Sequence, residues 1–166
     1  MSNLTTLECL VCRKHRGEVT VPGGLIFAND LISIYHAQLW GEEKDHYLGH
    51  FFVESNRHVP QLADLTEPEA QAIGLWTSRV AKALLQTEGV EHVYSFYIGD
   101  GVPHVHVHVI GRYPGAPREY WGPKVDDWPG APRGGAAEIA EVADRLRAYL
   151  REQHGPGASR SEILSS

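Results

Sequence analysis

The stretch that most constrains the fold is PHVHVHVIGR, residues 103–112, in which histidine and valine alternate three times. A repeat of two residues is the period of a β-strand, because successive side chains of an extended chain point to opposite faces. The valines predict a buried face, and the histidines predict the opposite, functional face. These histidines are His104, His106 and His108.

The spacing of a strand also limits what the three imidazoles can share. Two residues advance about 6.6–6.8 Å along a strand, so the outer pair, His104 and His108, lie about 13 Å apart at Cα. One small ion does not reach all three side chains over that distance. The histidines are therefore predicted to have different tasks.

Cys9 and Cys12 are the only cysteines, and they form a C-x-x-C motif. This spacing is typical of half a zinc site or of a redox pair. A redox pair usually follows a strand inside a βαβ unit, and no strand precedes this motif. The position favours zinc, with two unliganded thiols near the terminus as the alternative.

Composition describes an ordinary globular domain. The 166 residues suit one domain, and 42% hydrophobic and 22% charged residues are typical values. The net charge of −6 does not favour binding to nucleic acid or to an anionic membrane. No apolar run has transmembrane length, and the N-terminus lacks the pattern of a secretion signal. The expected location is therefore cytoplasmic.

The order of predicted elements is β-β-β-α-β-β followed by a helix, which predicts an α+β fold with an antiparallel sheet of about five strands and two helices. Three predicted strands come before the first helix, and a fourth lies between that helix and the histidine strand. They cover residues 23–30, 31–38, 46–55 and 92–99, and a tight DGV connection joins the last of them to the histidine strand.

The first helix is predicted within residues 65–90, since Thr66 and Glu69 form a capping box and Gly89 can end it. Its apolar stripe consists of Ile73, Trp76, Val80 and Leu84. A loop rich in Pro, Gly and aromatic residues, 113–137, precedes a second helix at 138–153. Residues 155–166 are predicted to be a disordered tail.

Two kinds of chemistry compete for the histidine face. One is a catalytic zinc ion held by His104, His106 and His108, as in zinc hydrolases. The other is nucleophilic attack by a neutral imidazole on phosphorus, which gives a phosphohistidine-type intermediate that water cleaves. That reaction needs one ring nitrogen held by a hydrogen bond and donors around the phosphate oxygens.

The segment HVHVHVI, residues 104–110, resembles the histidine triad motif, in which three histidines alternate with apolar residues. CLVC at residues 9–12 resembles the start of zinc-containing members of the histidine triad (HIT) superfamily. GHFFVESNRH, residues 49–58, resembles the segment that precedes the helix in that family. The resemblance runs from about Cys9 to about Tyr113, and it implies a HIT domain over residues 1–154 with its core at 9–113.

The resemblance implies a role for each histidine. His106 matches the nucleophile that attacks the α-phosphate of a nucleotide, and His108 matches the residue beside the phosphate and the leaving group. The implied ligands of a structural zinc ion are Cys9, Cys12, His58 and His104. His15 and His50 are rival ligands, although His50 matches a position nearer the nucleotide.

The sequence departs from the family pattern around the nucleotide. The connection before the triad, GDGVP, lacks the usual amide side chain, and Ser95 and Tyr97 are candidate replacements. His36 stands near the place of the acidic residue that contacts the ribose. Arg112 follows the motif and is a candidate phosphate contact. The substrate-binding set is thus predicted to be His50, Ser95, His108 and Arg112.

The implied activity is that of a nucleotide hydrolase that releases a nucleoside monophosphate of the AMP type. Family substrates include phosphoramidates, acyl- or sulfo-nucleotides and dinucleoside polyphosphates, and family members are commonly homodimers. A phosphorylase or transferase is a close variant. A non-catalytic nucleotide-binding or zinc-binding protein is the alternative from another class.

Overall fold

A computed structural model describes residues 8–159 and 162. An antiparallel sheet of five strands forms its centre, in the order β1-β2-β4-β6-β5. The strands are β1 (Phe27–Ala28), β2 (Ile32–His36), β4 (His50–Ser55), β6 (His106–Arg112) and β5 (His92–Phe96). A second, two-stranded sheet pairs β3 (His46–Tyr47) with β7 (Arg133–Gly134). The helices are α1 (Leu10–His15), α2 (Glu67–Thr87) and α3 (Ala136–His154), with single 3-10 turns at Leu62–Asp64 and Arg118–Tyr120.

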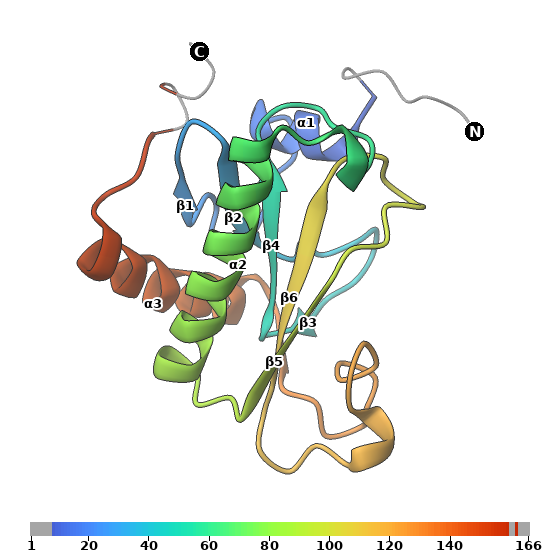
Figure 1. The fold of residues 1–166 in the computed structure, drawn as a ribbon. Coiled ribbons are helices and arrows are strands. Elements are labelled where there is room, and N and C mark those ends of the chain that lie inside the picture. The colour runs from blue at the N-terminus through green and yellow to red at the C-terminus, as the bar shows by residue number, and fades with distance from the viewer. Residues whose placement is uncertain (1–7, 160–161, 163–166) are drawn as a thin grey trace.

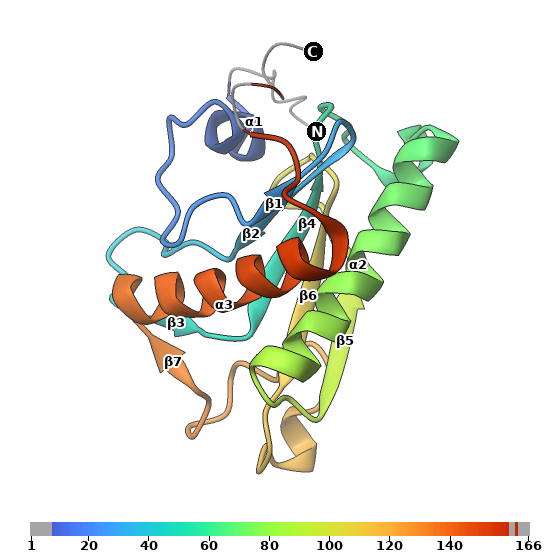
Figure 2. The same cartoon turned by 90° about the vertical axis from the view of Figure 1, so that its left-hand side faces the viewer.

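Helices α2 and α3 cover one face of the five-stranded sheet and cross each other over it (Figure 1, Figure 2). Their apolar sides and the sheet enclose the main core, to which Ile34, Val53 and Val109 contribute from three adjacent strands. The other face carries His106 and His108 and is approached by α1. The α+β class, the antiparallel sheet of five strands and the two main helices are confirmed.

Helix α2 begins where its capping box predicts. The side-chain hydroxyl of Thr66 accepts from the backbone N–H of Glu69, and the Glu69 carboxylate accepts from the N–H of Thr66 at 2.8 Å. Gly89 follows the helix with φ of +65°, a conformation that favours glycine. The predicted apolar stripe lies buried against the sheet: Ile73, Trp76, Val80 and Leu84.

The predicted strand 46–55 is two strands. The chain breaks between Tyr47 and His50, so that β3 leaves the main sheet to pair with β7. Gly49 lies at this break, and a Cβ there would come within 3.1 Å of the Tyr113 ring. The aromatic and apolar residues continue on both sides of the break, and the sequence therefore predicts a single strand there.

The histidine strand is shorter than its sequence pattern. Strand β5 ends at Phe96 and β6 begins at His106, so the connection is longer than the three residues DGV. His104 and Val105 lie just before β6, where Val105 bonds to the backbone of Val59 and Ser55 instead of to β5. The two strands are antiparallel, as expected, with Phe96 opposite His108.

The segment 113–137 carries β7 and a 3-10 turn, and its Val125 is buried with Tyr47 and Ile110. The beginning of the predicted tail lies against β1, since the Ala158 N–H donates to the Ala28 carbonyl at 2.7 Å. The rest of that tail, except residue 162, falls outside the described residues, as do residues 1–7 at the N-terminus.

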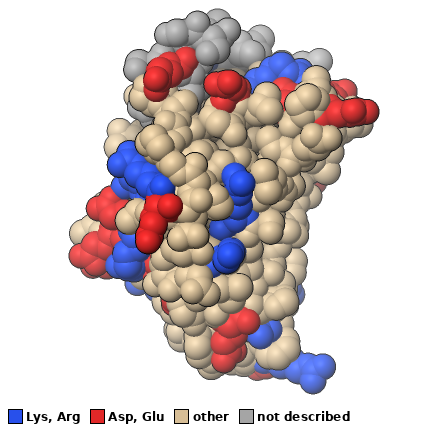
Figure 3. Space-filling view, turned by 60° about the vertical axis from the view of Figure 1, so that its left-hand side comes forward, with Lys and Arg blue, Asp and Glu red and all other residues tan. Residues whose placement is uncertain are grey.

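Among the described residues, no helix is both long and apolar enough to span a membrane. On the face drawn in Figure 3, acidic and basic side chains lie interspersed over a largely uncharged surface. That face has no continuous basic patch.

Candidate active site and metal centre

His106 is held as a neutral nucleophile requires. Its Nδ1 lies 2.5 Å from the backbone carbonyl of His104. A carbonyl only accepts, so Nδ1 carries the proton, and Nε2 of the neutral ring keeps its lone pair. The ring of Phe52 stands edge-on to the imidazole at 5.5 Å. The tautomer and the orientation of the ring are therefore both fixed.

Burial lowers the pKa of His106, and the hydrogen bond to the His104 carbonyl opposes that shift. Burial, followed by the nearby His106, lowers the pKa of His108 to about 4. Both imidazoles are therefore uncharged at neutral pH, and an uncharged imidazole retains the lone pair that attack on phosphorus uses.

His108 stacks on Phe96, with ring centroids 4.6 Å apart and planes 14° from parallel. Its Nδ1 lies 3.0 Å from Nε2 of His50, which is buried on the neighbouring strand β4. The structure thus brings the predicted residues His106, His108 and His50 together on one face of the sheet.

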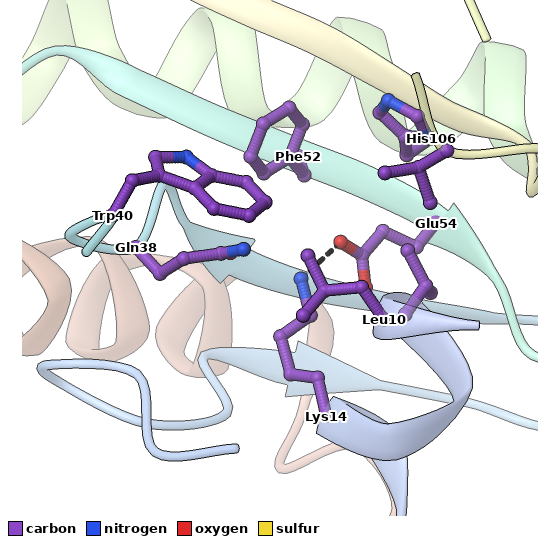
Figure 4. Close-up of a pocket in the computed structure, with 9 residues that line it drawn as sticks. Leu10, Lys14, Gln38, Trp40, Phe52, Glu54 and His106 are labelled. Carbon is purple, nitrogen blue, oxygen red and sulfur yellow. Dashed lines mark hydrogen bonds and ion pairs between the residues drawn. The ribbon is translucent and has the colours of Figure 1, made fainter. Parts of the chain in front are cut away.

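A pocket opens beside His106 on the side of α1 (Figure 4). Aliphatic side chains of α1, with Trp40 and Phe52, form much of its wall; Gln38, Glu54 and Lys14 are its polar members. Gln38 is 4% exposed, and its Oε1 has no hydrogen-bond partner among the described residues. A buried acceptor without a partner at a pocket wall is a site for a ligand donor.

Lys14 and Glu54 form an ion pair at the base of this pocket, drawn as a dashed line in Figure 4. Both side chains are buried, and Glu54 also accepts a hydrogen bond from His15 Nε2 at 2.8 Å. Burial alone would raise the pKa of Glu54, but Lys14 and His15 lower it to about 2. The carboxylate therefore stays charged beside the nucleophile, directly opposite His106 in the strand register.

Four predicted ligands meet in one cluster. The ligand atoms of Cys9, Cys12, His58 and His104 all lie within 4.8 Å of one another. His104 Nε2 lies 2.7 Å from the Ser55 carbonyl, so Nε2 carries the proton and the lone pair of Nδ1 faces the two sulfurs at 3.4 and 3.5 Å. Two sulfurs and two imidazole nitrogens are a donor set that fits a tetrahedral zinc ion.

The two thiols differ in their titration. The Cys12 thiol donates a hydrogen bond to Cys9 and thereby lowers the pKa of Cys9 to about 3, while burial acts in the opposite direction. The same bond raises the pKa of Cys12. A thiolate is thus already favoured at the cluster, and thiolate is the form that binds zinc.

The rival ligand His15 lies outside the cluster. Its ring stacks on Tyr35 at 5.8 Å, and its Nε2 is engaged by Glu54. His104 does not share the face of His106 and His108. It precedes β6, and its imidazole faces α1 and the two cysteines. The zinc hydrolase in which His104, His106 and His108 share one ion does not match this arrangement.

Two of the predicted substrate contacts, Ser95 and Arg112, lie elsewhere, and so does His36, which stands near the place of the family's ribose-contacting residue in the sequence. Ser95 pairs with Val109, and this register directs it to the face opposite His108. His36 is fully buried on the helix side, against Phe51. Arg112 lies under Trp121, 3.8 Å from its ring centroid, and donates to the Tyr94 hydroxyl.

Ser95 and His36 were expected near the nucleotide because their distance along the chain was right. A shift of one residue in a strand reverses the face of every side chain, and spacing alone does not fix that register. Tyr97 does lie near the nucleophile, with its ring 5.9 Å from that of His106, but its hydroxyl donates to the Pro60 carbonyl.

Sequence reasoning missed Lys14, Glu54, Gln38 and His46. Helix α1 has six residues, too few for a clear helical period. Glu54 did carry a signal, since it is a charged residue in the otherwise apolar strand HFFVES. A carboxylate in such a strand has to find a buried partner, and Lys14 is that partner.

Residues 41–115 match the HIT domain family. The match covers a little less than half of the chain, and together with the fold described above it makes the chain similar to proteins of the histidine triad superfamily.

Solved structures agree on the fold. A Zn-bound histidine triad family protein from Mycobacterium smegmatis is 15% identical, with a TM-score of 0.67, over 90% of this chain and 100% of the other. A Hit-like protein from Bartonella henselae is 16% identical, with a TM-score of 0.64, over 89% and 99%. A hypothetical histidine triad nucleotide-binding protein from Sulfolobus tokodaii is 14% identical, with a TM-score of 0.64, over 89% and 97%. The search of curated proteins gave no match.

Proposed function

We propose that the protein is a nucleotide hydrolase that releases a nucleoside monophosphate through a covalent intermediate on His106. The observation that carries this proposal is the hydrogen bond from His106 Nδ1 to the His104 carbonyl at 2.5 Å. It leaves Nε2 with a lone pair on the functional face, and the lowered pKa of His106 keeps that lone pair free at neutral pH.

The surroundings of His106 support one orientation of the substrate. His106 lines the pocket of Figure 4, whereas His108 and His50, which contact each other, do not line it. With the α-phosphate at Nε2, the nucleoside enters the pocket and the leaving group extends toward His108. The protonated nitrogen of His108 then donates to the leaving atom as the bond to phosphorus breaks.

The pocket suits a nucleoside in shape and chemistry. Trp40 is 47% exposed at its mouth and offers a flat surface for a base, and Gln38 offers its unpartnered oxygen to a ribose hydroxyl. Lys14 supplies positive charge near the phosphate while Glu54 balances it. Gln38 is thus the proposed contact of the ribose, in place of the acidic residue near whose position His36 stands in the sequence.

The Cys9, Cys12, His58 and His104 cluster is proposed to hold a structural zinc ion, and the related protein from Mycobacterium smegmatis is Zn-bound. Four protein ligands close the coordination shell, so the ion would supply stability and no chemistry. It would fix His104, whose carbonyl orients His106. A homodimer remains part of the proposal on the strength of the family resemblance, and a cytoplasmic location remains part of it as the expectation drawn from the sequence.

Hydrolysis of adenosine 5′-phosphoramidate and of a diadenosine polyphosphate tests the proposal. The wild type should release AMP from at least one of them. His106→Ala should lose at least about 100-fold in rate, the scale of a lost catalytic group. His92→Ala is the matched control, because His92 is an exposed histidine on the edge strand β5.

Binding of AMP separates this proposal from the non-catalytic alternative. If the wild type binds AMP but cleaves neither substrate, the protein is a nucleotide-binding protein and the proposal is wrong. If His106→Ala folds and retains full activity, attack by His106 is excluded. Added phosphate or a second nucleoside as acceptor would reveal a phosphorylase or a transferase.

A further inference from the structure

A continuous row of three imidazoles leads away from the proposed reaction centre. His108 Nδ1 lies 3.0 Å from His50 Nε2, and His50 Nδ1 lies 3.2 Å from His46 Nε2. The rings of neighbouring members are 5.1 and 5.4 Å apart and 30° from parallel. The three residues belong to β6, β4 and β3, so the row crosses from the main sheet to the small one.

The outer end of the row is a buried nitrogen that lies beside a partly exposed carboxylate, and the inner end is the nitrogen that would face a leaving group. His46 Nδ1 has no hydrogen-bond partner among the described residues and faces the Glu43 carboxylate at 3.6 Å. The Glu43 side chain is 42% exposed, so water has access there. At the other end, His108 Nε2 is the nitrogen that the row leaves unused.

A neutral imidazole carries one proton and one lone pair, so the two contacts of His50 oblige the row to point in one direction at a time. In one direction, His46 donates to His50, His50 donates to His108, and His108 Nε2 bears a proton. In the other direction every bond is reversed, and His108 Nε2 has a lone pair instead. The two arrangements differ by the passage of one proton along the whole row.

We propose that His46, His50 and His108 form a proton relay that carries one proton between solvent and the atom leaving phosphorus. This inference rests on the proposed function and assigns His46 as a positioning residue that acts through His50.

The protons and electron pairs balance in the first half-reaction. His106 Nε2 forms a bond to phosphorus, the bond from phosphorus to the leaving atom breaks, and that atom takes the proton of His108 Nε2. His108 Nδ1 takes the proton of His50 Nε2, and His50 Nδ1 takes the proton of His46 Nε2. His46 Nδ1 takes one proton that reaches it from water by way of the partly exposed Glu43 carboxylate.

The second half-reaction resets the row. Water attacks phosphorus, the bond to His106 breaks, and the proton of the water passes to His108 Nε2, which now has a lone pair. Each bond of the row then reverses, and His46 Nδ1 returns one proton to the solvent. No charge remains on any of the three imidazoles after either half.

The electrostatic surroundings suit such a relay. Burial, followed by His108 and His46, holds the pKa of His50 well below its usual range. Burial also lowers the pKa of His46, with Glu43 and Asp126 opposing the shift and Arg133 acting with it. His36 is the other titratable neighbour, with its ring 6.3 Å from that of His46. Neutral rings at physiological pH retain the lone pairs that a relay uses.

The choice of leaving group tests the relay. An amine leaving group needs a proton, whereas 4-nitrophenolate leaves without one. His46→Gln keeps one hydrogen-bonding group near His50, but an amide does not pass a proton between its two ends. In the first half-reaction, measured as release of the leaving group in a single turnover, we expect this variant to be at least about tenfold slower than the wild type with adenosine 5′-phosphoramidate, and within about twofold of the wild-type rate with the 4-nitrophenyl ester of AMP. His92→Gln is the matched control and should change neither rate.

A structural role for His46 gives a different result, because a distorted site slows both substrates alike. Equal losses on the two substrates, or no loss on either, would overturn the relay. If the wild type cleaves neither, the proposed function fails, and the row is then tested directly. In protein labelled with ¹⁵N-histidine, couplings between nitrogens across the hydrogen bonds should join His46 to His50 and His50 to His108. His46→Phe should remove the first alone, and absence of both from the wild type would overturn the relay.

Discussion

Lys14 and Glu54 are the two charged residues buried beside the nucleophile, and neither has more than 2% of its side chain exposed. Removing one member of a buried pair leaves the other charge without a partner in a poorly polarisable environment. Lys14 also lies against the rings of Tyr35 and Phe52, so its alkyl chain contributes packing. The stability of the site therefore depends on both charges of the pair being present together.

We expect Lys14→Met to lower the free energy of unfolding by about 3–5 kcal/mol, because Glu54 would then be buried with His15 as its remaining partner. The double variant Lys14→Met with Glu54→Leu should recover most of that loss, since no uncompensated charge remains. Urea unfolding of the wild type, both single variants and the double variant measures the coupling. Losses that simply add would show that the two charges do not depend on each other.

At the scale of elements, the four-ligand cluster joins three segments that are far apart in sequence. Cys9 and Cys12 lie at the start of α1, His58 follows β4, and His104 precedes β6. Helix α1 has six residues, well below the length of about 12–15 at which an isolated helix becomes marginally stable. The cluster therefore anchors α1 together with the contacts of Lys14 and His15 to Glu54, and α1 forms one wall of the pocket.

Removal of the metal should consequently loosen α1 and weaken nucleotide binding together. We expect about one zinc ion per chain by elemental analysis, and a melting temperature that falls by roughly 5–10 °C when a chelator removes it. Cys9→Ser should bind little zinc and show a similar fall. His92→Ala should retain both the metal and the melting temperature. Loss of activity on chelation with an unchanged melting temperature would instead favour a catalytic metal.

The elements themselves differ in how far the sequence predicts them. Helix α2 is predicted closely because its capping box and its stripe are local signals that agree. The strand at 46–55 is not, because the pairing of β3 with β7 depends on a segment almost ninety residues away. The four candidate metal ligands were named from motifs that carry the family resemblance, and they lie together in the structure, while the face of Ser95 depends on a register that no local signal fixes.

Over the whole molecule, several buried imidazoles link folding to pH. Burial lowers the pKa of His36 and of His108 to about 4, and it holds that of His50 lower than usual as well. In the unfolded chain these groups titrate near the ordinary value of about 6.5. Between the two values the unfolded chain binds more protons than the folded one, so stability rises with pH across this window.

Acidification should therefore destabilise the fold between about pH 7 and pH 4, before carboxylates titrate. His36 is fully buried, and its shift from 6.5 to about 4 corresponds to about 3 kcal/mol. The pKa of Glu54, lowered to about 2, adds a second loss that is complete only below that pH. The buried histidines thus cause the loss of stability between about pH 7 and pH 4, and the buried ion pair causes the further loss at lower pH.

Melting temperatures from pH 8 to pH 4 measure the first window. His36→Phe should be less stable at pH 8, because it lacks the hydrogen bond to the Ala37 carbonyl, but its melting temperature should fall less on acidification than that of the wild type. Comparison with the wild type cancels any contribution from acid release of the metal, which both proteins share. His92→Phe should keep the wild-type slope, since His92 is exposed. A slope for His36→Phe equal to that of the wild type would exclude His36 as a source of the acid sensitivity.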